Sequence, residues 1–233
     1  VGIERSPLIR DLKLTQCPVL SDAIFRIAVS ALRRLEVLSV GRSTKLSGRG
    51  LLNCLRSKRF PASRIRELRL PSMKYVDDIL MNDICQTIGS SLEILDVNNT
   101  NLSDSFLISI RNYNSNLKRL LAGNNHFTNG GLVSLVDSHN IRNPLLHLIE
   151  IDVSYSSGVS DSGVLSICSG YSKTLEILAI AGLENRLSVR GLHTITQILP
   201  KLKSMDLRFC SNIRPKNIKN LIYITKENVE IMR

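Results

Sequence analysis

A short pattern of apolar residues recurs along the whole chain and constrains its fold more than any other feature. The clearest copy has apolar residues at positions one, four and six (Leu92, Leu95 and Val97) and a small polar residue, Thr100, at position nine. Equivalent copies begin at Ile9, Leu35, Ile65, Leu92, Leu117, Leu148, Leu175 and Leu202. Successive copies start 25 to 31 residues apart. A regular period of this length indicates stacked structural units, each too small to bury its own apolar face.

The pattern is the signature of leucine-rich repeats, in which the apolar motif forms a short strand and the remainder of the unit returns as a helix. Because strand side chains alternate between two faces, positions four and six point into the core and positions three, five and seven point outward. We therefore expect residues 1–233 to form one α/β leucine-rich-repeat solenoid, a right-handed horseshoe with a concave parallel sheet of eight strands and convex helices. In this register Leu95 and Val97 are buried, whereas Asp96 and Asn98 face out.

Both ends of the chain depart from the repeat. We expect a C-terminal cap over about residues 214–233, with Pro215 at the first position of a last helix and residues 229–231 as a ninth, closing strand. Only eight residues precede the first strand, and no polar cap is visible among them. Terminal repeats expose an apolar edge unless something covers it. We therefore expect upstream sequence or another subunit to cover the first repeat.

Several repeats resemble the cysteine-containing subclass of leucine-rich repeats, which is typical of F-box proteins and their relatives. Position nine is Cys17 in the first repeat, where an aliphatic residue and a Ser-Asp pair follow it, and Cys210 in the eighth. Repeats four and five have Thr100 and Asn125 at this position and look more like the ribonuclease-inhibitor subclass. The resemblance implies a repeat domain that binds a protein partner, as in an F-box-like adaptor. The sequence contains no visible F-box, so a role as a ubiquitin-ligase subunit extends the resemblance.

The net charge of +11 is concentrated in one part of the chain. Residues 33–69 contain eleven basic and two acidic side chains, a net charge of +9. We expect eight of the basic residues to form one patch on the edge and convex side, namely Arg42, Lys45, Arg49, Arg56, Lys58, Arg59, Arg64 and Arg66. Such a patch attracts a phosphate backbone or an acidic protein surface. Only Phe60 adds an aromatic ring, which favours charge neutralisation over base stacking.

The concave sheet is the second candidate surface. Its outward positions combine charges of both signs with exposed aliphatic side chains, and Tyr155 and Phe209 lie next to the strand ends. This mixture suits a protein partner. The candidate partner-binding residues are Glu67, Arg69, Asp96, Asn98, Arg119, Leu121, Glu150, Asp152, Tyr155, Asp206 and Arg208.

The sequence contains no catalytic, metal-binding or cofactor-binding constellation. A nucleophile elbow, a phosphate loop and a zinc-protease helix are all absent. The four histidines lie in different repeats or loops without the spacing of metal ligands, at His126, His139, His147 and His193. We therefore expect a protein that is not an enzyme and that uses no metal or cofactor.

The five cysteines favour reduced thiols. Their number is odd and no two form a C-x-x-C pair, which indicates an intracellular reducing compartment such as the cytoplasm, the nucleus or an organellar matrix. Cys54, Cys85 and Cys168 lie in apolar helical stretches, where a small thiol fills core space. Cys17 and Cys210 lie at opposite ends of the predicted solenoid, so we expect no disulfide.

Two functions remain open from the sequence. The first is a protein-interaction module, either the partner-binding domain of an F-box-like adaptor or a structural subunit of a large assembly. The alternative is an RNA-associated subunit of a ribonucleoprotein such as a ribosome, docked through the basic patch. In either case we expect no membrane partner, since no apolar run reaches the roughly 18 residues that a bilayer requires, and no small-molecule substrate.

Overall fold

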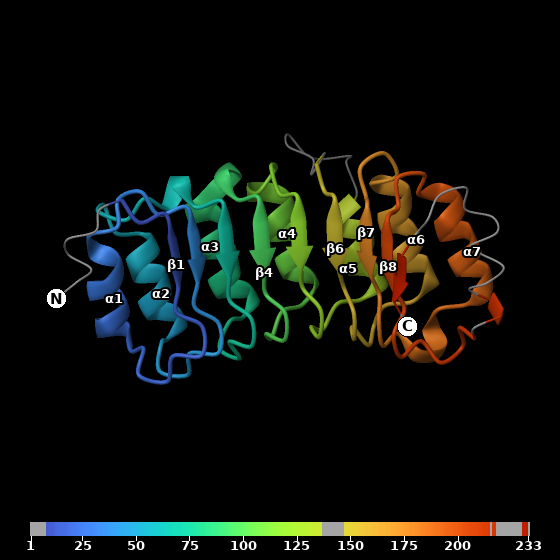
Figure 1. The fold of residues 1–233 in the computed structure, drawn as a ribbon, viewed down its shortest axis with the longest axis horizontal. Coiled ribbons are helices and arrows are strands. Elements are labelled where there is room, and N and C mark those ends of the chain that lie inside the picture. The colour runs from blue at the N-terminus through green and yellow to red at the C-terminus, as the bar shows by residue number, and fades with distance from the viewer. Residues whose placement is uncertain (1–7, 137–146, 215, 218–229, 233) are drawn as a thin grey trace.

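The computed structural model describes residues 8–136, 147–214, 216–217 and 230–232. Within these residues, nine parallel strands of three residues each form one sheet in sequence order (Figure 1). They are β1 (Asp11–Lys13), β2 (Val37–Ser39), β3 (Glu67–Arg69), β4 (Ile94–Asp96), β5 (Arg119–Leu121), β6 (Glu150–Asp152), β7 (Ile177–Ala179), β8 (Ser204–Asp206) and β9 (Glu230–Met232). The expected closing strand is confirmed, because β9 pairs with β8. The position predicted for a last helix, Pro215, lies outside the described residues.

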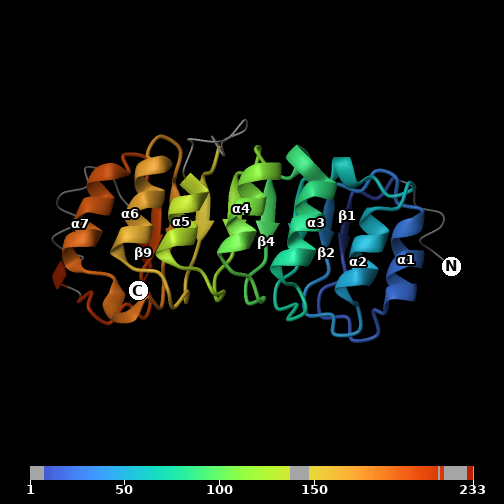
Figure 2. The same cartoon turned by 180° about the vertical axis from the view of Figure 1, so that it is seen from behind.

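One layer of helices covers one face of the sheet, as Figure 2 shows. The seven α-helices in the described part of the chain are α1 (Asp22–Ser30), α2 (Gly48–Leu55), α3 (Asp78–Ile88), α4 (Asp104–Tyr113), α5 (Asn129–Val136), α6 (Asp161–Gly170) and α7 (Val189–Ile198). Short 3-10 turns lie between a helix and the next strand at Ala62–Arg64 and Gly89–Ser91, and between β7 and α7 at Glu184–Arg186. The two-layer solenoid predicted from the repeat period is therefore confirmed.

The core lies between the two layers and uses the predicted positions. Leu95 and Val97 are fully buried, and the strands pair so that position four of every repeat lies beside position four of the next. The expectation for Asp96 was only partly right. This residue points to the concave face, but its exposed fraction is only 8%. Arg69, 3.8 Å away, and the backbone of Asn98 cover its carboxylate.

A side-chain latch joins the start of most helices to the start of the next. The carboxylate of Asp22, the first residue of α1, accepts bonds from the backbone N–H of Ser47 at 2.7 Å and from its hydroxyl at 2.6 Å. Ser47 is the N-cap of α2 and accepts a bond from the N–H of Gly50 at 2.9 Å. A Cβ on Gly50 would lie 2.1 Å from the Asp22 carboxyl carbon, so this position requires glycine. Equivalent latches join Asp78 to Ser103, Asp104 to Thr128, Asn129 to Ser160 and Asp161 to Ser188.

The first repeat is less well covered than the others. Its core side chains Ile9, Leu12 and Leu14 are only partly buried, whereas their counterparts in the next repeat are fully buried. The outer side of α1 and the loop before it expose Val19 and Ile27. The described part of the first repeat therefore leaves apolar side chains open to solvent.

Candidate protein-binding surface

The arginines of the concave sheet are neutralised by acids on the same face. Arg69 bonds to Glu67, two residues earlier on β3. Arg119 on β5 bonds across the sheet to Glu150 on β6. The cations therefore offer the face little free positive charge.

A third concave ion pair follows β8. The Arg208 guanidinium bonds to the Asp206 carboxylate at 2.6 Å. Burial of Asp206 opposes its ionisation, but the hydrogen bonds and charge of Arg208 outweigh that effect and lower the pKa of the carboxyl. Asp206 is therefore ionised and internally paired.

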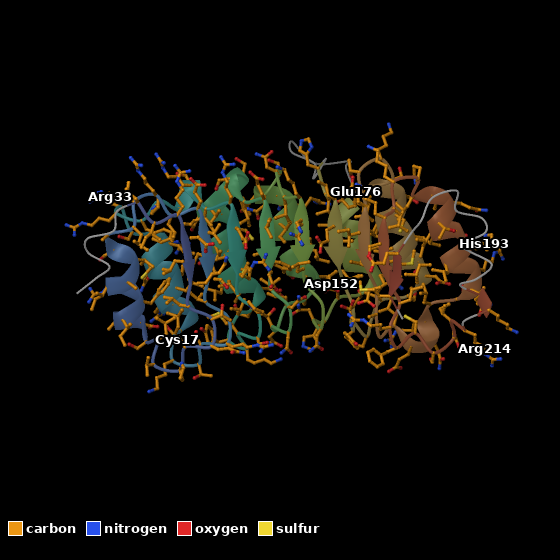
Figure 3. The ribbon with its side chains drawn as sticks, in the orientation of Figure 1. Cys17, Arg33, Asp152, Glu176, His193 and Arg214 are labelled. Atoms are coloured by element: carbon orange, nitrogen blue, oxygen red, sulfur yellow. The ribbon has the colours of Figure 1, made fainter. Side chains whose placement is uncertain are left out.

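Asp152 differs from the other acids of the face. Burial raises its pKa, and the charges of Asp206 and Glu150 raise it further, against hydrogen bonds from Ser154. Among the residues that the structure describes, none forms an ion pair with Asp152, although the charge of Arg208 acts on it from a greater distance. Figure 3 shows it on the sheet, near the middle of the solenoid. The concave face therefore presents one carboxylate that has no direct ion pair within the described chain.

Position eight of every repeat lies at the rim where the strand ends, and its backbone has a positive φ throughout. The φ angles lie between 56° and 67° at Gln16, Arg42, Ser72, Asn99, Asn124, Tyr155, Gly182 and Phe209. In this conformation the N–H of position eight donates to the carbonyl of position seven in the next repeat, as from Tyr155 to Ala181 at 2.8 Å. The left-handed turn thus extends the hydrogen bonding of the sheet beyond its strands.

Two of these rim positions hold aromatic side chains. The Tyr155 and Phe209 rings lie 6.2 Å apart at an angle of 45°, with exposed fractions of 47% and 72%. Gly182 stands between them in the row, and a Cβ there would lie 2.2 Å from the Tyr155 ring. The left-handed region is sterically costly for a bulky residue. An exposed aromatic pair is thus held in a conformation that suits asparagine or glycine better.

A trough of about 680 Å³ runs along the concave side of the rim. Its lining includes Asp96, Asn98 and Tyr155 from the predicted surface, together with Arg42 from the predicted basic patch. The structure therefore places Tyr155 beside the acids and amides of the concave sheet. Half-buried Leu121 lies on β5 between the strands that hold Asp96 and Asp152.

The eight basic residues do not form the single patch that the sequence predicted. Strands separate the two kinds of loop in each repeat, so loops before and after a strand lie at opposite edges. Figure 3 shows Arg33, which precedes β2, at the upper edge and Cys17, which follows β1, at the lower edge. Arg42 and Lys45 belong to a loop that follows a strand, whereas Arg64 belongs to one that precedes a strand.

The remaining members of the predicted patch are divided further. Arg49 and Arg59 line a convex groove of about 660 Å³ between α1 and α2. Two others are paired with acids, Arg56 with Asp83 at 3.0 Å and Arg66 with Glu93 at 3.3 Å. Exposed Lys58 follows α2 in the same loop as Arg59. The sequence count showed where basic residues are abundant but not which face or partner each one has.

The described thiols and histidines show no grouping that suits chemistry. All five cysteines are free, and burial raises the pKa of Cys85 and Cys168 to about 12. In the described ranges, no group of His, Cys, Asp and Glu could hold a metal ion. His126 is exposed and bonds to Asn101, while His139 lies outside the described residues. Across those same ranges, no helix has the length and apolar character needed to cross a membrane.

Comparison with known proteins bears on the fold. No protein-family model matches the sequence, and no curated protein matches it. A chain of the yeast Rad7–Elc1 complex superposes with a TM-score of 0.65 at 14% identity, over 92% of this chain and 60% of that one. A leucine-rich-repeat protein of Leptospira interrogans superposes with a TM-score of 0.51 at 16% identity, over 99% of this chain and 56% of that one. The chain folds as a leucine-rich-repeat solenoid.

A third structure extends the comparison. The C-terminal domain of tropomodulin from Caenorhabditis elegans gives a TM-score of 0.50 at 18% identity, over 66% of this chain and 92% of that one. At these identities the likeness concerns the fold alone. The chain spans 60% and 56% of the first two structures that it matches. The cysteine-containing subclass stays a prediction.

Proposed function

We propose that this solenoid binds a protein partner through its concave sheet and the adjoining rim, without catalysing a reaction. The observation that supports this most is the exposed pair Tyr155 and Phe209, held at positive φ at the rim that follows the strands of Asp152 and Asp206. Neither ring is needed to build the repeat, because Asn99 and Asn124 occupy the same position in other repeats.

The chemistry of this corner favours a basic side chain from the partner. Lys and Arg side chains stack on aromatic faces, and a nearby cation stabilises an ionised carboxylate that burial destabilises. The charge of Arg208 already acts on both Tyr155 and Asp152, and a partner cation that reached the same two groups would meet both conditions. Tyrosine is also enriched among the residues that dominate binding energy at protein interfaces.

Two partner contexts fit this surface equally, the partner-binding domain of an F-box-like adaptor and a structural subunit of a large assembly. The alternative, an RNA-associated subunit of a ribonucleoprotein, has weaker support. It rested on one dense basic patch, and the eight residues are divided among different loops and faces, two of them in ion pairs. Phe60, the aromatic residue nearest to them in sequence, is buried.

The test is affinity purification from native extract, followed by mass spectrometry, with wild type and a Tyr155→Asn/Phe209→Asn variant. Asparagine keeps the left-handed backbone and removes only the rings. A Gln16→Asn/Ser72→Asn variant is the matched control, since it makes the same replacement at two other rim positions. We expect the aromatic variant to lose specific partners that the control retains, with or without RNase treatment.

Retention of every partner by the aromatic variant would move the interface elsewhere. Loss of the partners after RNase treatment of wild type would favour the ribonucleoprotein alternative instead. Thermal melting of both variants, compared with wild type, separates a loss of folding from a loss of binding.

A further inference from the structure

Position two of the repeats forms a ladder of alternating charge along the edge where the strands begin. Glu36 pairs with Arg10 at 3.3 Å, and Glu93 pairs with Arg66 at 3.3 Å and with Lys118 at 2.7 Å. Towards the other end of the solenoid, a further carboxylate–ammonium pair of 2.8 Å continues the ladder. Most of this edge is therefore self-neutralised.

Beside the ladder, at the first three repeats, four arginines line one pocket. The pocket has a volume of about 330 Å³ and is lined by Arg10, Arg33, Arg34, Glu36 and Arg64. The only acid, Glu36, is paired with Arg10. In the described part of the chain, no acid pairs with Arg33, Arg34 or Arg64.

The repeat register brings these arginines together. Arg34 and Arg64 each stand just before the first apolar residue of their repeat, so they are neighbours across one strand spacing of about 4.8 Å. Arg33 is adjacent to Arg34 and lies at the same edge in Figure 3. Three exposed guanidinium groups therefore share a small volume without a counter-charge, which an anion would relieve.

We propose that this pocket binds a phosphate group on a protein partner, within a segment that contains phosphorylated serine or threonine. A guanidinium group matches phosphate oxygens with two parallel hydrogen bonds, and such bonds are stronger than neutral ones. A phosphomonoester has close to two negative charges at neutral pH, which suits three unpaired arginines. This site lies at the opposite edge of the sheet from the aromatic rim and is independent of the function proposed above.

The surroundings favour a single phosphate over a nucleic acid backbone. A backbone requires a continuous positive track, yet the positions that follow Arg34 and Arg64 in the next two repeats are the neutral residues Ser91 and Asn116. The adjoining ladder alternates in sign, with Glu93 next to Arg66. Nucleic acid also uses exposed rings for stacking, whereas Phe60, in the loop that leads to Arg64, is buried.

Fluorescence anisotropy with the full chain tests the proposal. The probes are a fluorescein-labelled degenerate peptide library centred on phosphoserine, its unphosphorylated counterpart and a 20-nucleotide uridine RNA. We expect wild type to bind the phosphorylated library at least about tenfold more tightly than the other two probes, the scale of one or two charge-assisted bonds.

Three variants identify the site. Arg34→Gln/Arg64→Gln should weaken phosphopeptide binding at least tenfold, as expected for the loss of two guanidinium groups. Arg34→Lys/Arg64→Lys keeps both charges without the fork geometry and should fall between that variant and wild type. Lys45→Gln/Arg49→Gln, a charge-matched control in and next to a loop at the opposite edge of the sheet, should bind like wild type. Unchanged thermal melting should accompany all three, because the altered side chains are exposed.

Three outcomes would overturn the proposal. Equal loss in the control and in Arg34→Gln/Arg64→Gln would mean diffuse charge attraction. Tighter binding of the RNA than of the phosphopeptide, lost in the same variant, would make the pocket a nucleic-acid site. Absence of binding to every probe at low salt would leave the arginines as solvated surface.

Discussion

Repeats four and five have asparagine at position eight, where the backbone has a positive φ, whereas repeats six and eight have an aromatic residue there. At position eight the φ angles are nearly identical, 56° at Asn99 and Asn124, 57° at Tyr155 and 61° at Phe209. The asparagines bond to each other at 2.7 Å along the rim, and asparagine tolerates the left-handed region through such local bonds. The aromatic residues have no equivalent advantage for the fold. The rim residues Asn99 and Asn124 therefore stabilise the fold. The aromatic residues Tyr155 and Phe209, which we call the aromatic rim, fit binding to a partner better than stabilisation of the fold.

Position nine shows the same contrast. Asn125 in repeat five is buried and bonds to Thr100, to the N–H of Leu102 and to the carbonyl of Val97. Ser156 in repeat six is also buried, but its hydroxyl has no hydrogen-bond partner among the described residues. The buried polar side chain at position nine is thus hydrogen-bonded in the central repeats and unsatisfied in the sixth repeat, which also contains Tyr155. At functional sites, proteins commonly relax the rule that buried polar groups are hydrogen-bonded.

The largest expected effect is that of truncating core side chains, which tests whether the difference between the central and the C-terminal repeats extends to the core. Leu95→Ala in β4 and Leu178→Ala in β7 remove fully buried side chains at the same repeat position. Each should lower the free energy of unfolding by roughly 2–5 kcal/mol, measured by urea denaturation. Similar values would confine the contrast to the rim. A much smaller loss at Leu178 would show that the C-terminal core is itself less well packed.

Next in size is the loss of the buried asparagine. Asn125→Ala leaves several buried backbone groups without a hydrogen bond. It should lower the free energy of unfolding by about 2–4 kcal/mol, because each unsatisfied group costs about 1–3 kcal/mol. Ser156→Ala is the matched change in the next repeat and should cost less than about 0.5 kcal/mol, since its hydroxyl makes no bond to lose. Equal costs in the same denaturation assay would contradict the contrast at position nine.

Substitutions at Tyr155 and Phe209 should not lower the free energy of unfolding, in contrast to the two kinds of substitution above. Tyr155→Asn and Phe209→Asn relieve the left-handed backbone and expose less apolar surface, so each should leave stability unchanged or raise it by up to about 1 kcal/mol. Gln16→Asn provides the comparison without an aromatic ring. A clear rise in stability that accompanies lost partner binding would show a functional rather than a structural role. A fall of more than about 1 kcal/mol would mean that the rings support the fold.

Sequence reasoning reached the fold but only part of the site, for a physical reason. The apolar positions of the repeat determine the register, so Leu95, Val97 and the closing strand could be placed from the period alone. Charge pairing depends on side chains from neighbouring repeats. Arg69 covers Asp96, and Glu93 neutralises Arg66, and a count of charged residues along the sequence does not predict either contact.

The conformation of the rim was also missed. Its signal in the sequence was asparagine or glycine at position eight of three repeats, at Asn99, Asn124 and Gly182, because both residue types favour positive φ. Gly182, which stands between Tyr155 and Phe209 in the row, is the residue that indicates positive φ in this part of the chain. An aromatic residue does not itself indicate positive φ, so the sequence predicts Tyr155 and Phe209 as aromatic residues near strand ends and not as strained ones.

The smallest predicted effect compares two carboxylates of one row, Asp152 and Asp206. The pKa of Asp206 is lowered, so its ionised form stabilises the fold at neutral pH and that contribution is lost as pH falls through the lowered pKa. The pKa of Asp152 is raised above 3.8, so its ionisation costs stability as pH rises through the raised value, and the cost persists at neutral pH.

Asp152→Asn should therefore stabilise the protein slightly near neutral pH, and Asp206→Asn should destabilise it, each by less than about 1 kcal/mol. Both differences should vanish in strong acid, where both wild-type carboxyls are protonated. Urea denaturation at several pH values measures them. Asp152→Asn should at the same time weaken a partner whose cation meets this carboxylate. Stabilisation without any loss of partner binding would leave Asp152 outside the interface, while a loss of stability would mean that it has a cation in the folded state after all.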